Sequence, residues 1–178
     1  MSKIEIVPIT KENADILALP NEPFREEGRV IPKFDGKNWN YEIEKFSEDK
    51  VREECFPDEN YKFEEMGDKL HGLAIYVDGE DAGYALIYEQ WNKWLYLDNL
   101  LIRKKFKRKG LGSALIKEAI ELAKKYNKLG ISLVCQSYNL PAAKFYFKNG
   151  FMLGGIQELL YEGTKLEGQM DLYLYKRI

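Results

Sequence analysis

The stretch over residues 94–127 constrains the fold more strongly than any other part of the sequence. Its first nine residues, Trp94–Ile102, are mostly apolar and have the length of a strand, and six of the seven residues in Arg103–Lys109 are basic. Beyond Gly110, apolar residues recur at spacings of three and four, which is the pattern of an amphipathic helix. The residues with this spacing are Leu111, Leu115, Ala119, Leu122 and Tyr126. The stretch therefore predicts a strand, a basic glycine-bearing turn and a helix over Gly110–Asn127.

The other expected elements are strands and helices around one irregular region. Leu70–Val77 and Ala82–Tyr88 are predicted to form a hairpin, because Asp78-Gly79 between them is a strong turn signal. The remaining strands are expected at Ile4–Ile9, Ile131–Cys135, Phe151–Leu160 and Gln169–Lys176, and the remaining helices at Lys11–Leu19 and Pro141–Lys148. Residues 21–68 are expected to form loops, with one helix near Glu42–Glu54. This order predicts an α/β fold, with a mixed, mostly antiparallel sheet flanked by helices in a single domain over residues 1–178.

Composition indicates a globular protein and excludes several functional classes. Hydrophobic residues make up 45% of the 178 residues, which is enough material for one core. The net charge of −2 argues against general nucleic-acid binding, and no apolar stretch approaches the roughly 20 residues of a membrane span. The N-terminus lacks the apolar region of a secretion signal, so a cytoplasmic location is expected. Cys55 and Cys135 are far apart and His71 is the single histidine, so we expect neither a disulfide framework nor a metal site.

The basic turn has the properties of an anion site. The first amide groups of a helix are unpaired and the helix dipole places partial positive charge there, so this end of a helix binds anions. Gly110 and Gly112 carry no Cβ, which would let a diphosphate approach the backbone closely. The sequence is neither a Walker A loop nor a Gly-x-Gly-x-x-Gly fingerprint. Taken alone, the glycines are also consistent with the plain start of a helix, and the basic run with a solvated face.

A second segment, read together with the basic turn, narrows the possible functions of the turn. Residues 139–151 read Asn-Leu-Pro-Ala-Ala-Lys-Phe-Tyr-Phe-Lys-Asn-Gly-Phe. Lys107-Arg108-Lys109-Gly110-Leu111-Gly112 stands in place of a Gln/Arg-x-x-Gly-x-Gly/Ala pattern, with lysine at its first position. In this order, the two segments resemble two motifs of the GNAT superfamily of acetyl-CoA-dependent N-acetyltransferases. The resemblance implies the acyl-CoA N-acyltransferase fold, with a sheet splayed at residues 94–102, and acetyl-CoA as cosubstrate without a metal.

Flanking segments narrow the resemblance within the superfamily. The runs Phe56-Pro57-Asp58, Trp91-Asn92 and Leu160-Tyr161-Glu162-Gly163 are similar to those of streptothricin (nourseothricin) acetyltransferases, and the likeness runs from Leu17 onward. That group implies acetylation of an amino group in the β-lysine moiety of streptothricin, which confers antibiotic resistance. The partner would then be a small cationic amine of the streptothricin class, with no nucleic acid or membrane involved, and a homodimer is one open arrangement.

The resemblance also assigns residues to the coenzyme. In such enzymes the pantetheine arm pairs with main-chain groups of the splayed strand, here around Leu100 and Ile102, and a bulge near Leu101 frees an N–H for the thioester carbonyl. The pyrophosphate would bind to the N–H groups of Lys107–Ser113. The implied coenzyme-binding residues are Leu100, Leu101, Ile102, Lys107, Arg108, Lys109, Gly110, Leu111, Gly112, Ser113, Asn139 and Tyr146. For Asn139, capping of the second helix is an equally good interpretation.

Asp98 and Tyr146 are the implied catalytic residues. A carboxylate at Asp98 would bind the ammonium group of the substrate and accept its proton, and the Tyr146 hydroxyl would hydrogen-bond to the departing thiolate. The alternatives are a carboxylate satisfied by neighbouring groups and a tyrosine that only packs. The implied substrate-binding residues are Glu89, Trp91, Asp98, Glu158 and Glu162. Trp94 and Tyr96 suit either the pocket or the core.

The mechanism and the acceptor have alternatives at this point. Cys135 lies on an apolar strand and has no evident base partner in the sequence, so direct transfer of the acetyl group is favoured over an acyl-cysteine route. A polyamine, a protein N-terminus or a lysine is an alternative acceptor. A CoA-binding module without transferase activity is a further alternative, but the presence of both Asn139 and Tyr146 favours an enzyme.

Overall fold

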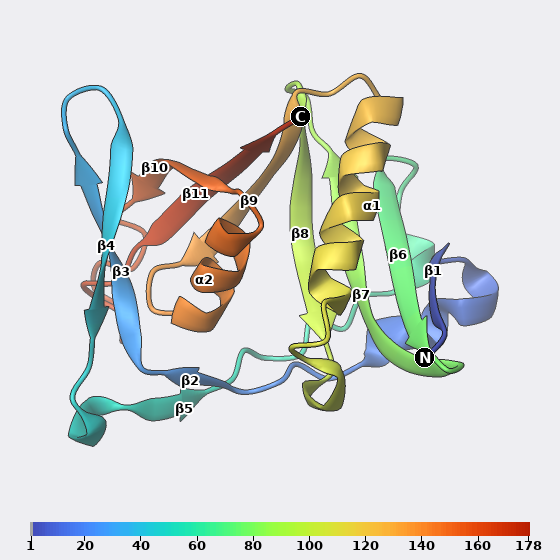
Figure 1. Cartoon of the computed structure of the whole chain (residues 1–178), viewed down its shortest axis with the longest axis horizontal. Helices are drawn as coiled ribbons and strands as arrows, with labels where there is room; N and C mark the ends of the chain where they lie inside the picture. The colour runs from blue at the N-terminus through green and yellow to red at the C-terminus, as the bar shows by residue number, and fades with distance from the viewer. Residues whose placement is uncertain (1) are drawn as a thin grey trace. The chain divides into compact units, whose positions relative to one another are not determined.

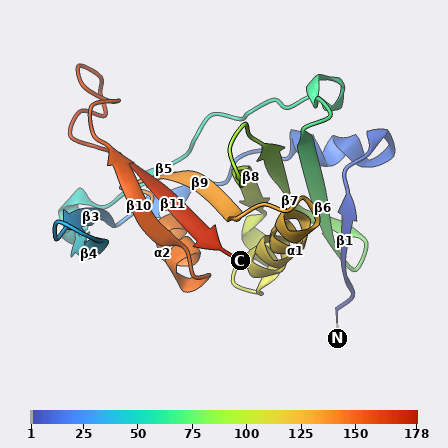
Figure 2. The same cartoon turned by 90° about the horizontal axis from the view of Figure 1, so that it is seen from above.

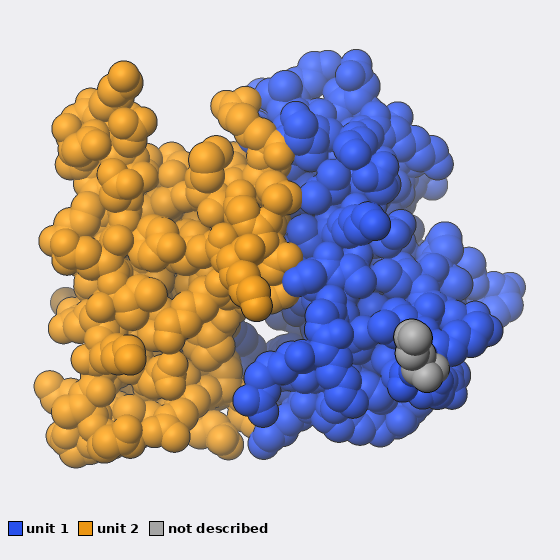
Figure 3. All heavy atoms as spheres, viewed as in Figure 1, with its two compact units in different colours: residues 1–22, 56–131, 178 blue, residues 23–55, 132–177 orange. Residues whose placement is uncertain are grey.

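The computed structural model describes residues 2–178 (Figure 1). Contacts between Cα atoms divide the chain into two compact units, which Figure 3 shows in two colours. Unit 1 comprises the chain up to Glu22, Phe56–Ile131 and Ile178, and unit 2 comprises Pro23–Cys55 and Ser132–Arg177. The expectation of a single domain over residues 1–178 stays a prediction.

Four strands of unit 1 pair antiparallel. They are β1 (Ile4–Pro8), β6 (Leu70–Val77), β7 (Glu80–Glu89) and β8 (Trp94–Ile102), and they are neighbours in that order. Asp78 and Gly79 join β6 to β7 with φ angles of 51° and 81°, and a two-residue hairpin turn of this kind requires both angles to be positive. The predicted hairpin, the first strand and the strand over residues 94–102 are therefore confirmed.

The helix α1 (Leu111–Lys125) packs on one face of these strands (Figure 1). Leu111, Leu115 and Ala119, three of the residues with helical spacing, are buried, so the apolar stripe faces the sheet as predicted. Two short 3-10 helices of unit 1 lie outside the sheet, η3 (Phe63–Glu65) and η4 (Lys104–Phe106). None of the helices within residues 2–178 has both the length and the apolar character needed to cross a membrane.

The opposite face of the unit 1 sheet is covered by η1 (Lys11–Ala18), as Figure 2 shows from above. Its buried residues Ile16 and Leu17 belong to a core cluster that also contains Ile9, Ala74, Tyr84, Leu86 and Leu101. The helix predicted over Lys11–Leu19 is thus present in 3-10 form. Asn13 interrupts the helical angles with φ −124° and ψ 17°, and its side-chain oxygen accepts a hydrogen bond from Thr10 N at 2.7 Å.

Unit 2 holds a second group of strands and the helix α2 (Leu140–Lys148). β9 (Gly130–Gln136, which belongs to unit 2 from Ser132), β11 (Asp171–Arg177) and β10 (Met152–Gln157) are neighbours in that order, and β10 pairs antiparallel with β11. Gly150 follows α2 with a φ of 82°, as expected for a glycine after a helix. The strand predicted over Phe151–Leu160 ends earlier, at Gln157, because the Gln157 side chain accepts a hydrogen bond from Leu159 N at 3.1 Å and begins a series of turns.

The helix expected near Glu42–Glu54 is wrong. These residues contain β4 (Trp39–Lys45) in part, the 3-10 turn η2 (Glu48–Lys50) and β5 (Arg52–Glu54). β4 pairs with β3 (Gly28–Phe34), and β5 pairs with β2 (Phe24–Glu26), so much of the expected loop region is also strand. The physical reason is a period of two in β4, where Trp39, Tyr41 and Ile43 alternate with polar residues.

Candidate functional site

The basic turn before α1 is held by one buried aromatic residue and by ion pairs of two of its basic residues with Glu80. Phe106 is buried, and the Nζ atoms of Lys105 and Lys109 lie 5.1 and 5.4 Å from the centre of its ring. Arg103 donates to the carbonyl oxygen of Asp81 at 2.9 Å and pairs with Glu80, which also binds Lys105. Arg103 and Lys105 therefore bind residues of the β6–β7 hairpin. At the end of the turn the side chains of Lys107, Arg108 and Lys109 are exposed.

The backbone between the turn and α1 leaves a run of amide groups available. Arg108 and Gly110 adopt positive φ angles of 63° and 82°, which turn the chain into the helix. Ala114 N is the first amide that donates back, to Gly110 O at 3.0 Å. Within residues 2–178 the amides of 108–113 have no acceptor, and a Cβ added to Gly110 would meet nothing within 4 Å. This open, basic helix start has the donors that an anionic diphosphate requires.

A β-bulge in β8 sits at Asp98, and the predicted bulge near Leu101 is therefore wrong in position. Leu86 of β7 pairs with Asn99, whereas the next residue, Ile87, pairs with Leu97, so the register shifts across Asp98. Leu101 itself is in regular pairing with Tyr84. The shift also breaks the strict alternation that was expected along β8, because Leu97 and Asn99 pair with residues on opposite faces of β7.

Asp98 is exposed and hydrogen-bonded to a tyrosine from a distant segment. Tyr61 donates its hydroxyl to Asp98 Oδ2 at 2.8 Å, and its ring packs against the core cluster under η1. Burial, followed by the bond to Asp98, raises the pKa of Tyr61 above its usual value of 10.0, so the proton stays on the phenol. Asp98 therefore acts as an acceptor in this pair and is free to hold a cation.

Two further carboxylates that sequence analysis did not single out act on the same buried tyrosine as Asp98 does. Burial, followed by the charges of Glu59, Asp58 and Asp98, raises the pKa of Tyr84 to about 12. Asp58 is held in place by Asn21, whose backbone N–H donates to Asp58 Oδ1 at 2.7 Å. The available signal was the Asp58-Glu59 pair itself, which lies in one of the segments that resembles the streptothricin enzymes.

The structure does not place Glu89 or Trp91 next to Asp98. Glu89 Oε1 accepts a hydrogen bond from His71 Nε2 at 3.1 Å, and Glu89 Oε2 lies 3.5 Å from Lys128 Nζ. The contact with His71, followed by the charge of Lys128, lowers the pKa of Glu89. Glu89 pairs with Leu95 on the face toward α1, whereas Asp98 contacts Tyr61 on the face toward η1. Trp91 projects from the β7–β8 turn and is 97% exposed.

The predicted site residues of unit 2 lie on α2 and the turns after β10. Asn139 is the N-cap of α2, and its side-chain oxygen accepts from Ala142 N at 3.3 Å, which confirms the capping interpretation and leaves its coenzyme role a prediction. Tyr146 is partly buried in an aromatic group, with ring centres 5.2 Å from Phe145 and 5.4 Å from Phe151. The remaining two, Glu158 and Glu162, are exposed.

Cys135 is poorly suited to act as a nucleophile. It is buried on β9, and this burial raises the pKa of its thiol to about 12. Its Sγ donates to Gln136 O at 3.6 Å. Because the thiolate is the reacting form, an acyl-cysteine intermediate at Cys135 is disfavoured. Residues 2–178 contain no group of three or more histidine, cysteine or acidic side chains arranged to hold a metal ion.

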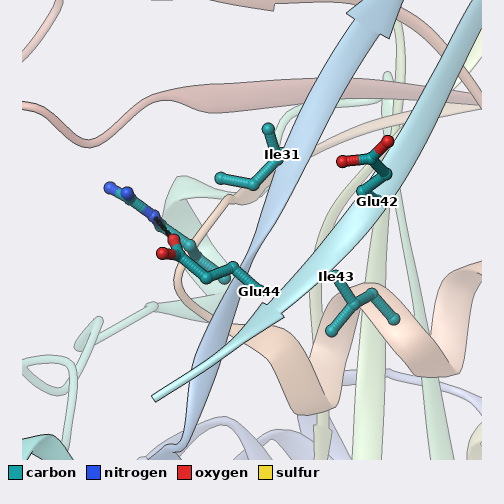
Figure 4. Close-up of a pocket in the computed structure, with 5 residues that line it drawn as sticks. Ile31, Glu42, Ile43 and Glu44 are labelled. Atoms are coloured by element: carbon teal, nitrogen blue, oxygen red, sulfur yellow. Dashed lines mark hydrogen bonds and ion pairs between the residues drawn. The ribbon is translucent and has the colours of Figure 1, made fainter. Parts of the chain in front are cut away.

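Two shallow depressions lie in unit 2, and predicted site residues line neither. The first, of about 380 Å³, lies on the β3–β4 hairpin, and its lining residues are Arg29, Ile31, Glu42, Ile43 and Glu44 (Figure 4). Glu44 pairs with Arg29 at 2.5 Å and Glu42 with Lys33 at 3.4 Å, so these carboxylates are already neutralised. The second, of about 510 Å³, is lined by residues 37–41 and 151–153.

The known proteins that are similar to this chain in sequence or in structure are acetyltransferases. The profile of the Acetyltransferase (GNAT) family matches residues 38–151. Streptothricin acetyltransferase A of Bacillus subtilis is 30% identical over 170 residues, which are 96% of this chain and 98% of that protein. The crystal structure of a candidate streptothricin acetyltransferase from Bacillus anthracis, in complex with acetyl coenzyme A, has a TM-score of 0.87 at 24% identity and 99% coverage of both chains. A nourseothricin acetyltransferase has a TM-score of 0.79 at 22% identity and 98% coverage of both.

Proposed function

Because the chain belongs to the GNAT family of N-acetyltransferases and has its acyl-CoA N-acyltransferase fold, we propose that it transfers the acetyl group of acetyl-CoA to the β-lysine moiety of streptothricin. The observation that carries this substrate is the match to streptothricin acetyltransferase A, which spans nearly the whole of both chains. Resistance to the antibiotic and a cytoplasmic location are part of the proposal.

The open amides before α1 support acetyl-CoA as the acetyl donor. Lys107 N already donates to Lys104 O at 3.2 Å, so the pyrophosphate would accept hydrogen bonds from the N–H groups of residues 108–113. The side chains of Lys107, Arg108 and Lys109 would offset its charge. The pantetheine arm would lie along Leu100–Ile102, with Asn139 and Tyr146 as further contacts. When bound, acetyl-CoA supplies an activated thioester, and the residues of the chain need only bind, orient and exchange protons.

The Asp98–Tyr61 pair supports a cationic amine as acceptor. An amine arrives as an ammonium ion and must lose a proton before its nitrogen can attack the thioester carbonyl. Asp98 would attract the ammonium group and accept this proton, directly or through a water molecule, while Tyr61 holds the carboxylate in one orientation. The Tyr146 hydroxyl would hydrogen-bond to the thiolate that leaves. With Cys135 protonated and buried, transfer is direct from thioester to amine.

Mass spectrometry tests the substrate. Streptothricin incubated with the protein and acetyl-CoA should gain one acetyl group, with CoA released in equal amount. Spermidine, tested in parallel, represents the alternative of a general polyamine acetyltransferase. If spermidine is acetylated and streptothricin is not, the substrate assignment is wrong. If no amine in a panel is acetylated above background, the alternative of a CoA-binding module is supported instead.

A further inference from the structure

A backbone amide attaches the basic turn before α1 to the N-terminal segment of the chain. Glu22 Oε1 accepts a hydrogen bond from Lys104 N at 2.9 Å, although the two residues are 82 positions apart in the sequence. Lys104 is the first residue of η4, so its amide is one that the helical turn cannot satisfy by itself. Glu22 therefore caps η4, the part of the basic turn that leads into residues 108–113.

Glu22 contacts the basic turn through the backbone and not through an ion pair. The turn is rich in lysine and arginine, yet within residues 2–178 no basic side chain lies within ion-pair distance of Glu22. Arg103 and Lys105 pair with Glu80 instead. A carboxylate next to an anion site opposes the binding of phosphate groups unless it serves another purpose. The hydrogen bond to Lys104 N is such a purpose, because it fixes the place of the turn.

The residue before Glu22 joins the same segment to the loop that carries Tyr61. Asn21 Nδ2 donates to Pro57 O at 2.6 Å, and Asn21 N donates to Asp58 Oδ1 at 2.7 Å. The loop reaches Tyr61 three residues later, and its hydroxyl donates to the carboxylate of the proposed amine site at 2.8 Å. Two adjacent residues of one segment therefore hold both the basic turn and this loop.

We propose that Glu22 is a positioning residue for acetyl transfer, because its bond to Lys104 N fixes the basic turn relative to the loop that carries Tyr61. This inference rests on the proposed binding of the pyrophosphate to residues 108–113 and of the amine to Asp98. A coenzyme with a displaced pyrophosphate also presents its thioester at a displaced point, and a reaction between two bound groups is sensitive to shifts of about 1 Å. Loss of the bond should therefore weaken coenzyme binding and slow the transfer itself.

Calorimetric titration with acetyl-CoA, in the absence of an amine, tests the contact. Glu22→Ala removes the acceptor and should raise the dissociation constant about tenfold, as expected for the loss of a hydrogen bond to a charged group. Glu22→Gln keeps an acceptor oxygen without the charge and should stay within about threefold of the wild type. Glu118→Ala removes an exposed glutamate of α1 and is the control, so it should leave the constant unchanged.

Lys104→Pro removes the same hydrogen bond from its donor side. Proline has no N–H and is accepted at the first residue of a helical turn, and Arg103 before it has a ψ of 142°, in the range that a following proline requires. Lys104→Ala is the reference, since it removes the same side-chain charge and keeps the N–H. Proline should bind acetyl-CoA about tenfold more weakly than alanine, and Glu22→Ala should then have no further effect. Additive losses, or equal losses in Glu22→Ala and Glu22→Gln, overturn the proposal.

Turnover at saturating acetyl-CoA tests the position of the thioester. With an amine that the wild type acetylates, Glu22→Ala should lower kcat several-fold, and Glu22→Gln should restore it. A kcat of Glu22→Ala equal to that of the wild type overturns the positioning role, because only coenzyme affinity would then depend on Glu22. The proposed function fails separately, since streptothricin would then gain no acetyl group while calorimetry still measures the contribution of the bond to Lys104 N.

Discussion

Tyr61 donates its hydroxyl to Asp98 Oδ2 across 2.8 Å, although the two residues are 37 positions apart in the sequence. The tyrosine comes from the segment before η3, and the aspartate is the residue at which β8 bulges. Within residues 2–178 the other oxygen of Asp98 has no donor. The pair thus presents one carboxylate oxygen in a defined direction, which is what binding and deprotonation of an ammonium group require.

Asp98→Asn should lower kcat/KM for the amine and leave the affinity for acetyl-CoA unchanged. The amide keeps the size of the side chain and can still accept from Tyr61, but it neither attracts a cation nor takes up a proton. We expect kcat/KM for the amine to fall by about 10²-fold or more, the lower end of general base catalysis. The measurement is steady-state kinetics, with acetyl-CoA affinity from calorimetry as control. A loss of acetyl-CoA affinity would show instead that Asp98 is a structural carboxylate.

Tyr61→Phe should act only through Asp98. Loss of the hydroxyl leaves the carboxylate free to rotate, so we expect the KM of the amine to rise several-fold, consistent with a charged hydrogen bond of about 1.5–3 kcal/mol that water partly replaces. In the Asp98→Asn background the same change should have little further effect. Kinetics of both single variants and the double variant measure this coupling. Additive losses would mean that Tyr61 serves the fold rather than the carboxylate.

Gly110→Val should abolish most coenzyme binding through the shape of the backbone. Gly110 has a φ of 82°, which a β-branched residue does not tolerate, so the amides of the turn would be displaced. Gly79→Val is the matched control, because Gly79 has a φ of 81° and equally open surroundings but lies in the β6–β7 turn. Both variants should lose about 1–2 kcal/mol or more of stability.

Calorimetric titration with acetyl-CoA separates the two glycine variants. Gly110→Val should lose acetyl-CoA binding by a much larger factor than either Gly79→Val or Arg103→Ala, since Arg103 is engaged by Glu80 and Asp81 O. Equal losses in Gly110→Val and Arg103→Ala would reject the assignment of the turn as the pyrophosphate site.

The free energy of unfolding should fall as the pH rises above about 9. Burial raises the pKa of Cys135 from 9.0 to about 12, and burial with the nearby carboxylates raises that of Tyr84 from 10.0 to about 12. Both groups keep their protons in the folded chain and release them first in the unfolded chain. Their stabilisation is therefore complete below the unfolded pKa values and is lost between about pH 9 and 12, at up to about 1.4 kcal/mol per pH unit for each group.

Urea denaturation at a series of pH values measures this slope. Cys135→Ala should make the decrease between pH 9 and 10 shallower, whatever its effect on stability at pH 7. Cys55→Ser, at an exposed position, should leave the slope unchanged. An identical pH dependence in the wild type and Cys135→Ala would contradict the assignment of a buried, protonated thiol.

Local patterns predicted those parts of the fold that depend on neighbours in sequence. The spacing of Leu111, Leu115 and Ala119 and the Asp78-Gly79 turn each define an element without reference to the rest of the chain. The bulge at Asp98 could not be found in this way, because it exists only through the register between β7 and β8. The same holds for the hydrogen bond between Tyr61 and Asp98. The helix expected near Glu42–Glu54 is an error of another kind. The alternation of Trp39, Tyr41 and Ile43, which indicates a strand, can be read from the sequence alone.

Tyr146→Phe should slow the chemical step and leave coenzyme binding intact. The ring contacts of Tyr146 with Phe145 and Phe151 do not need the hydroxyl, so the packing of α2 should survive. A thiol has a pKa of about 8.5 and a phenol about 10, so full proton transfer to the leaving thiolate is uphill by roughly 2 kcal/mol, and a hydrogen bond that becomes donation late in the step is the milder requirement. We expect turnover to fall by about 10²-fold, with the KM for acetyl-CoA little altered.

Tyr41→Phe is the control for this variant. It removes a hydroxyl from a ring that stacks on Phe147 of α2, with the ring centres 3.9 Å apart, and it should keep full turnover. Single-turnover measurements isolate the chemical step, and an unchanged rate in Tyr146→Phe would show that this tyrosine only packs.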